Sequence, residues 1–227
     1  MKCKYEICAM QILLTAATTQ EIEPFTTSNN KVDVLITGLG IPSTMYHLQK
    51  RIQQVDYDCI IQAGIAGGFT NDIELGKVVL VQQDCFADLG IEEKEIYNPI
   101  FNTGFADKDE FPFTNGWLIN THEALLTTSL PKVKALTVNK VSDSELQKQQ
   151  FISTFNAVAE SMEGAALHYV CLQEKIPFLQ IRSISNHVGE RDKTKWKMKE
   201  AIENLNTELT ALINARLNES FGQGLTI

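Results

Sequence analysis

The chain has 227 residues, 44% of them apolar, which is long enough to bury the core of one large domain. Its 20 basic and 28 acidic residues leave a net charge of −8, and the absence of a Lys/Arg run argues against binding to nucleic acid. No stretch of sequence approaches the roughly 20 apolar residues that a membrane-spanning helix needs, so we also expect no membrane partner.

The N-terminal segment and the cysteines bear on the cellular compartment. Lys2 and Lys4 precede an apolar run, as in a signal peptide, but Glu6 and Gln11 interrupt the pattern and favour a buried first strand. The cysteines are odd in number and form no CxxC pair, so they indicate neither a disulfide framework nor a zinc site. We expect reduced core thiols, no metal and a cytoplasmic protein. The cysteines are Cys3, Cys8, Cys59, Cys85 and Cys171.

Short apolar runs alternate with helical patterns, which is typical of an α/β fold whose sheet is covered on both faces. We predict one three-layer domain over residues 1–217 around a twisted, mainly parallel sheet, followed by a tail, residues 218–227, that frays. The predicted strands are residues 7–16, 32–37, 59–63, 77–83, 134–139, 157–161 and 178–183.

The helical patterns differ in what they predict. Residues 43–54 follow a Gly-containing turn, with Pro42 near the helix start. Residues 162–172 are apolar nearly all round, which indicates a buried helix, whereas the helix after Lys193 has one apolar face. Residues 84–116 are irregular and predict a binding loop or lid. This loop contains Phe101, Phe105, Phe111 and Phe113.

Four segments fall at the ends of predicted strands, where ligands bind in open α/β folds. They are residues 17–21, the glycine-rich residues 64–68, residues 160–164, and Ser185-Asn186. A glycine-rich segment is either a tight turn or a place where the backbone approaches a ligand, and both interpretations stand. Glu163 begins a helix that should be buried, so its carboxylate needs partners. Either the helix dipole or the hydroxyls of a sugar would suit it.

Together these motifs resemble a known superfamily. AATTQEI, AGIAGGF, ESMEGAA and IRSISN, in this order and spacing, are similar to motifs of the nucleoside phosphorylases and the methylthioadenosine/adenosylhomocysteine nucleosidases. Within that superfamily, MEGAA followed by ISNHVGERDKTKW most resembles the futalosine hydrolases of the alternative menaquinone pathway. The resemblance implies a hydrolase of the N-glycosidic bond of futalosine, acting as a homo-oligomer, a dimer or higher. Nothing in the sequence suggests a metal or an organic cofactor.

The resemblance also implies roles for individual residues. Glu21 would orient and deprotonate the attacking water, and Met162 and Glu163 would pack under the ribose and bind its hydroxyls. The rest of the expected substrate-binding set is Ala66, Gly67 and Ser161.

Asn186 departs from the nucleosidase pattern, in which an acidic residue assists the leaving adenine. A carboxylic acid can hand a proton to N7, whereas an amide only donates a hydrogen bond. An amide suits a 6-oxopurine such as hypoxanthine, because that base can carry negative charge on O6 as it leaves. We therefore assign Asn186 a catalytic role and predict that adenine nucleosides are poor substrates.

Water is the expected nucleophile. Phosphorylases of the superfamily hold phosphate with Gly and Arg near the first strand, but this chain has Thr18, Thr19 and Gln20 there, and its first Arg is Arg51. The carboxylate of Glu21 would also repel phosphate.

Several alternatives stay open. Glu145, in SDSE, is either part of a helix cap or an acceptor for the N1–H of hypoxanthine. Arg191 and Lys193 either face solvent or meet the distal carboxylate of futalosine. The alternative functions are a methylthioadenosine/adenosylhomocysteine nucleosidase, a purine nucleoside phosphorylase, and a purine-nucleoside binding module without catalysis.

Overall fold

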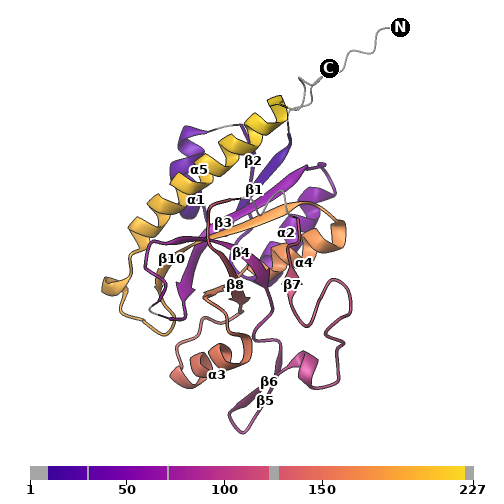
Figure 1. Ribbon diagram of the computed structural model, residues 1–227, viewed down its shortest axis with the longest axis vertical. Coiled ribbons are helices and arrows are strands. Elements are labelled where there is room, and N and C mark those ends of the chain that lie inside the picture. Colours follow the sequence, from indigo (N-terminus) through magenta and orange to yellow (C-terminus); the bar gives the residue numbers. More distant parts are fainter. Residues whose placement is uncertain (1–9, 30, 71, 123–127, 223–227) are drawn as a thin grey trace.

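The computed structural model describes residues 10–29, 31–70, 72–122 and 128–222, arranged around one central sheet (Figure 1). The strands of this sheet are β1 (Ile12–Ala16), β2 (Asp33–Ile36), β3 (Cys59–Gly68), β4 (Val78–Asp84), β7 (Leu118–Ile119), β8 (Lys132–Thr137), β9 (Ala159–Ser161) and β10 (Phe178–His187). The helices are α1 (Thr19–Ser28), α2 (Ile41–Ile52), α3 (Glu145–Phe155), α4 (Gly164–Glu174) and α5 (Met198–Gly222).

The sheet is mainly parallel, as predicted. Its strand order is β10-β4-β8-β9-β3-β1-β2, and β7 pairs with β4. The pairs β10–β4, β3–β9 and β4–β7 are antiparallel, and the other pairings are parallel. Since β10 also pairs with β3, the strands from β10 to β3 close into a ring. The carboxyl ends of β1, β3 and β10 therefore lie next to one another.

Two helical layers cover the sheet: α1 and α5 lie on one face, and α2 and α4 lie on the other (Figure 1). Successive side chains of a strand point to opposite faces, so β1 contributes to both cores. Ile12 and Leu14 pack in the same cluster as Leu205 of α5. Leu13 packs with Leu48 of α2 on the other face. The predicted three-layer α/β architecture is confirmed.

The predicted strands form, but β3 and β10 run further than expected, to Gly68 and His187. The glycine-rich segment is therefore not a turn, because it pairs along β10, with Gly64 opposite Arg182 and Gly67 opposite Asn186. A Cβ on Gly64 would collide with the guanidinium of Arg182, which explains the glycine at this place. Asn186 likewise lies within β10 rather than after it. Of the first predicted strand, residues 7–9 lie outside the described residues.

The predicted helices form with shifted starts. α2 begins at Ile41 and α4 at Gly164, so Met162 precedes its helix. α5 begins at Met198 and continues to Gly222, so residues 218–222 of the predicted tail belong to it. Residues 223–227 lie outside the described part of the chain.

Two helices were not predicted, α1 and α3. α1 contains Pro24, a residue that disfavours helix interiors. Its start carries a signal that could have revealed it, because Thr18 and Glu21 have the spacing of a capping box. α3 begins after Ser144, whose side chain accepts a hydrogen bond from Gln147 N, so SDSE does contain a helix cap. The cap residue is Ser144, however, and Glu145 is the first residue of the helix rather than the Glu of a capping box.

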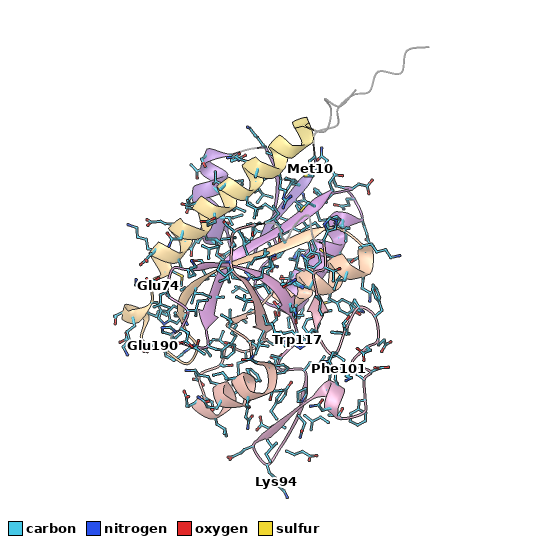
Figure 2. The ribbon with its side chains drawn as sticks, viewed as in Figure 1. Met10, Glu74, Lys94, Phe101, Trp117 and Glu190 are labelled. Atoms are coloured by element: carbon cyan, nitrogen blue, oxygen red, sulfur yellow. The ribbon has the colours of Figure 1, made fainter. Side chains whose placement is uncertain are left out.

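The segment 84–116 is less irregular than expected. It contains a hairpin, β5 (Gly90–Glu93) and β6 (Ile96–Pro99), whose tip at Lys94 points away from the sheet (Figure 2). Phe113 packs against Phe101 and against Tyr169 of α4, with ring centroids 5.0 and 5.9 Å apart. Phe105 and Phe111 stay exposed, at 78% and 61%. One part of the segment is thus anchored to α4, and another presents aromatic rings to solvent.

Two further expectations concern the core and the helices. Cys59, Cys85 and Cys171 are buried and free, as predicted, whereas Cys3 and Cys8 lie outside the described residues. Among the helices of the described part, none is both long and apolar enough to cross a membrane.

Candidate active site

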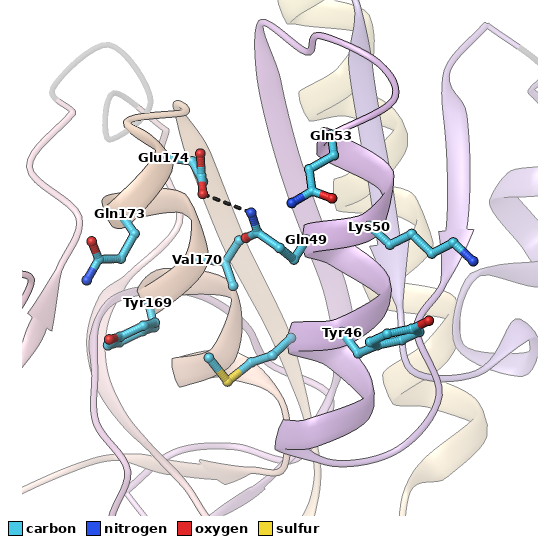
Figure 3. Close-up of a pocket in the computed structure, with 9 residues that line it drawn as sticks. Tyr46, Gln49, Lys50, Gln53, Tyr169, Val170, Gln173 and Glu174 are labelled. Carbon is cyan, nitrogen blue, oxygen red and sulfur yellow. Dashed lines mark hydrogen bonds between the residues drawn. The ribbon is translucent and has the colours of Figure 1, made fainter.

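Two pockets in the surface are candidates for the functional site. The larger, about 770 Å³, is a groove between α2 and α4 (Figure 3). Its polar lining consists of surface side chains such as Gln49, which donates a hydrogen bond to Glu174. The smaller, about 300 Å³, lies at the carboxyl ends of β1, β3, β9 and β10 and gathers buried carboxylates. Buried carboxylates that lack a full set of hydrogen-bond or ion-pair partners are rare in proteins and occur mainly at functional sites. We therefore assign the site to the smaller pocket.

All the residues predicted from sequence to form the site line this smaller pocket. They come from four separate parts of the chain: Glu21, Ala66, Gly67, Ser161, Met162, Glu163 and Asn186. The structure brings these residues together, and their chemical roles remain predictions.

Glu21 is held in place from two sides. The first turn of α1 carries it, and its Oε2 accepts hydrogen bonds from Thr18 N at 2.9 Å and Thr18 Oγ1 at 3.0 Å. From β3, Ile65 N donates to Oε1 at 3.1 Å. The side chain is buried yet lines the pocket. Because a carboxylate has about four acceptor positions, one oxygen can still accept a proton or hydrogen bond from a ligand.

Glu163 caps the start of α4 and joins it to the start of α2. Its Oε1 accepts a hydrogen bond from Gly40 N at 3.1 Å. Gly40 has a φ of 86°, a left-handed conformation that glycine adopts without strain. Burial raises the pKa of Glu163, while the charge of Arg182 opposes that shift. The hydrogen bond from Gly40 thus orients the carboxylate, and the charge of Arg182 offsets only part of the effect of burial on its pKa.

Arg182 is a site residue whose placement the sequence did not reveal. It is 1% exposed, its Nη2 donates to Gln62 Oε1 at 2.7 Å, and the same Nη2 lies 3.7 Å from Glu163 Oε2. A Cβ on Gly64 would collide with this guanidinium and lie 2.9 Å from Glu21 Oε1, so the cation borders both carboxylates. A neighbouring cation favours the ionised form of a carboxylate. Arg182 therefore forms a buried ion pair with Glu163.

Asp84 extends this cluster of charges into the core. Burial raises its pKa to about 6, and hydrogen bonds from Thr137 and Gln180, then the charge of Arg182, oppose the shift. Arg182 therefore interacts with several acidic side chains at once.

Asn186 borders the pocket from β10. Its Oδ1 accepts a hydrogen bond from Ser185 Oγ at 2.8 Å, and its Nδ2 donates to His187 O at 3.0 Å. An amide NH₂ has two hydrogens, so one remains for a ligand. Ser161 Oγ is buried and has no hydrogen-bond partner among the described residues, which leaves it free for a ligand hydroxyl.

The pocket contains residues that the sequence did not predict, and several residues that the sequence offered as candidates lie elsewhere. Glu160, which is 5% exposed, and the apolar wall formed by Trp196, Met198 and Ile202 also line the pocket. Glu145, the residue considered for a purine N1–H, is exposed on α3, where its Oε1 accepts a hydrogen bond from Gln149. Arg191 and Lys193 are exposed as well.

The sheet and the buried carboxylates of its pocket are those of an α/β enzyme whose candidate site lies at the carboxyl ends of the strands. Residues 15–216 match the family model described as "Phosphorylase superfamily", so the chain belongs to this superfamily. This result confirms the resemblance of the sequence motifs.

Individual proteins of known name show which enzymes the chain is similar to. The chain is similar to a futalosine hydrolase of Streptomyces coelicolor, with 29% identity over 64% of this chain and 61% of that protein, which is less than two thirds of its length. A solved futalosine hydrolase of Helicobacter pylori has a TM-score of 0.76 at 16% identity, covering 91% of this chain and 98% of that one. A 5′-methylthioadenosine/S-adenosylhomocysteine nucleosidase of the same organism has the same TM-score and identity, covering 91% and 99%. The fold is therefore shared by proteins of different names and does not by itself select a substrate.

Proposed function

We propose that this chain hydrolyses the N-glycosidic bond of futalosine, releasing hypoxanthine and dehypoxanthine futalosine in menaquinone biosynthesis. The observation that carries the proposal is the composition of the pocket, in which Glu21 and Glu163 lie with the amide of Asn186. The likeness to the futalosine hydrolase of Streptomyces coelicolor supports the same substrate.

The two carboxylates suit the chemistry of this bond. Its cleavage builds positive charge on the ribose in a transition state like an oxocarbenium ion. In the proposed mechanism Glu163 binds the ribose hydroxyls, while Glu21 orients a water molecule and removes its proton. The charge of Arg182 lowers the pKa of Glu163 against the effect of burial, and as carboxylates Glu21 and Glu163 would stabilise the positive charge as it develops.

Asn186 supports a 6-oxopurine as the leaving group. Its free N–H can donate to N7 or O6 of hypoxanthine, which carries negative charge on O6 as it departs. Adenine instead leaves best when an acid protonates N7, and an amide cannot supply that proton.

The pocket also supports water rather than phosphate as the nucleophile. Among the described residues that line it, none is Lys, Arg or His. Glu21 occupies the place next to the ribose, where its negative charge would repel a phosphate ion.

The test is chromatography of the base released from futalosine, methylthioadenosine, adenosylhomocysteine and inosine, each with and without phosphate. We expect hypoxanthine from futalosine at a rate that does not depend on phosphate. Release of adenine would favour the methylthioadenosine/adenosylhomocysteine nucleosidase alternative, and a phosphate requirement would favour a phosphorylase. If no nucleoside is cleaved, the chain is a binding module instead.

We also propose that two copies of the chain pack together across the groove between α2 and α4 (Figure 3). Tyr46 is 62% exposed there, beside Met45, Tyr169 and Val170. α2 begins shortly after Leu39, which lines the catalytic pocket and is 67% exposed, so a partner would border the mouth of that pocket. The same patch on both copies would give a closed dimer. Light scattering should show a dimer mass that Tyr46→Glu lowers to the monomer; a monomeric wild-type chain contradicts the proposal.

The proposed compartment is the cytoplasm. Cys59, Cys85 and Cys171 are free thiols, and disulfides form mainly in oxidising compartments outside it.

A further inference from the structure

Glu160 is a buried carboxylate in the pocket that the proposed mechanism does not use. Ser142 N donates to its Oε1 at 3.1 Å, and Ser142 Oγ donates to its Oε2 at 2.6 Å. Both oxygens thus act as acceptors, as in an ionised carboxylate. Burial raises the pKa of Glu160, and the hydrogen bonds from Ser142 oppose that shift. A buried carboxylate that lines a pocket is a candidate for ligand binding.

The register of the sheet places Glu160 across from Asn186. On β3, Gly67 is the direct partner of Glu160 of β9 on one side and of Asn186 of β10 on the other. Neighbouring strands lie about 4.8 Å apart, so the Cα atoms of Glu160 and Asn186 are roughly 10 Å apart. Directly paired residues project to the same face of a sheet. Gly67 has no side chain between the amide and the carboxylate, and the side chain of Val188 packs against it there.

The apolar surface beside this amide suits a planar bicyclic base. A Cβ on Gly67 would lie 3.0 Å from Val188 Cγ2 and 3.5 Å from Asn186 Nδ2, so Val188 packs over the glycine, and both neighbours also line the pocket. Val141, next to Ser142, is another pocket residue, so the loop that holds Glu160 also borders this space.

We propose that Glu160 determines specificity by accepting the N1–H of a 6-oxopurine base while Asn186 binds the opposite edge. This inference rests on the proposed function and deepens it. A 6-oxopurine carries hydrogen on N1, whereas adenine presents a lone pair there. A carboxylate that only accepts hydrogen bonds attracts the first and repels the second. Glu160 thus takes the role considered for Glu145, which is exposed on α3.

The test is the binding of free hypoxanthine and free adenine to wild type and to Glu160→Gln, measured by calorimetry. Free bases report recognition without depending on turnover. An amide can turn either its oxygen or its NH₂ towards the base, so it no longer discriminates. We expect the preference of the wild type for hypoxanthine to fall by about 10- to 100-fold in Glu160→Gln, the size of a hydrogen bond to a charged group.

Two control variants separate recognition from structure. Glu145→Gln changes the exposed carboxylate and should keep the wild-type preference. Ser142→Ala removes a hydrogen-bond donor but keeps the carboxylate, so it should also keep most of the preference. If Ser142→Ala loses the preference as fully as Glu160→Gln does, Glu160 acts only by anchoring its loop, and the inference is overturned.

A measurement on the wild type keeps the inference testable if Glu160→Gln does not fold. In 1-methylhypoxanthine a methyl group replaces the N1 hydrogen, so we expect binding at least about tenfold weaker than that of hypoxanthine. Equal binding of the two bases, or an unchanged preference in Glu160→Gln, overturns the role of Glu160. Either result leaves futalosine hydrolysis untouched, because that is judged separately by the release of base from the nucleoside.

Discussion

Glu21→Gln should lower kcat by about 10²- to 10⁴-fold, the usual contribution of a general base. The amide cannot take a proton from water, although it fills the same space in the first turn of α1. It can accept hydrogen bonds through one oxygen only, so one of the donors Thr18 and Ile65 loses its partner. We therefore expect a loss of unfolding free energy of about 1 kcal/mol, small enough for the variant to fold.

The measurement is the steady-state rate of hypoxanthine release at saturating futalosine, with the thermal midpoint of unfolding recorded for each variant. Glu23→Gln is the matched control, because Glu23 lies two residues further along α1 and is exposed. It should behave like wild type in both measurements. Turnover close to wild type in Glu21→Gln would exclude Glu21 as the base.

Arg182→Met should lower the free energy of unfolding by about 3–5 kcal/mol, the usual effect of removing one partner from a buried ion pair. The variant leaves Glu163 buried without its cation, and Gln62 Oε1 loses the donor that lies 2.7 Å away in the wild type. Asp84 also interacts with the charge of Arg182, so the variant removes a favourable interaction from this second buried carboxyl group. Denaturant titration measures the change.

The loss should depend on pH with a definite sign. Burial raises the pKa of Glu163 in the folded chain, and removing Arg182 raises it further. A raised carboxyl pKa stabilises the folded state below the ordinary Glu pKa, and this contribution disappears as the pH rises through the folded-state pKa. Arg182→Met should therefore be least destabilised at acidic pH and most destabilised at neutral pH.

A second substitution tests whether the uncompensated carboxylate is the cause. Glu163→Gln removes that charge, so the double variant Arg182→Met/Glu163→Gln should be more stable than the sum of the two single losses predicts. Arg51→Met is the control, because its ion pair with Asp33 is partly exposed and should contribute about 1 kcal/mol or less. If the two single losses simply add, the cation does not act through Glu163.

The sequence by itself determined the class of fold and the segments that form the site. Buried strands must be apolar and about four to eight residues long, so runs such as the one around Ile60 and Ile61 identify them without knowledge of their neighbours. Polar residues directly after such runs, including Glu21 and Glu163, were predicted to share one pocket because parallel strands end at the same edge of a sheet. The structure places both in that pocket.

Only the tertiary structure decided which partners these residues have. The residues around Gly64 and Gly67 look like a turn in the sequence, but pairing with β10 extends β3 through them. The same pairing puts Arg182 beside the carboxylates. The pairing of β9 with β3 places Glu160 at the pocket, in the role for which the sequence offers Glu145. The contacts between β3 and β10 join residues far apart in the chain, 120 positions in the case of Gln62 and Arg182. Strand register depends on the whole sheet rather than on local pattern. A local pattern therefore reveals which residues are polar at a strand end, but not which ones meet.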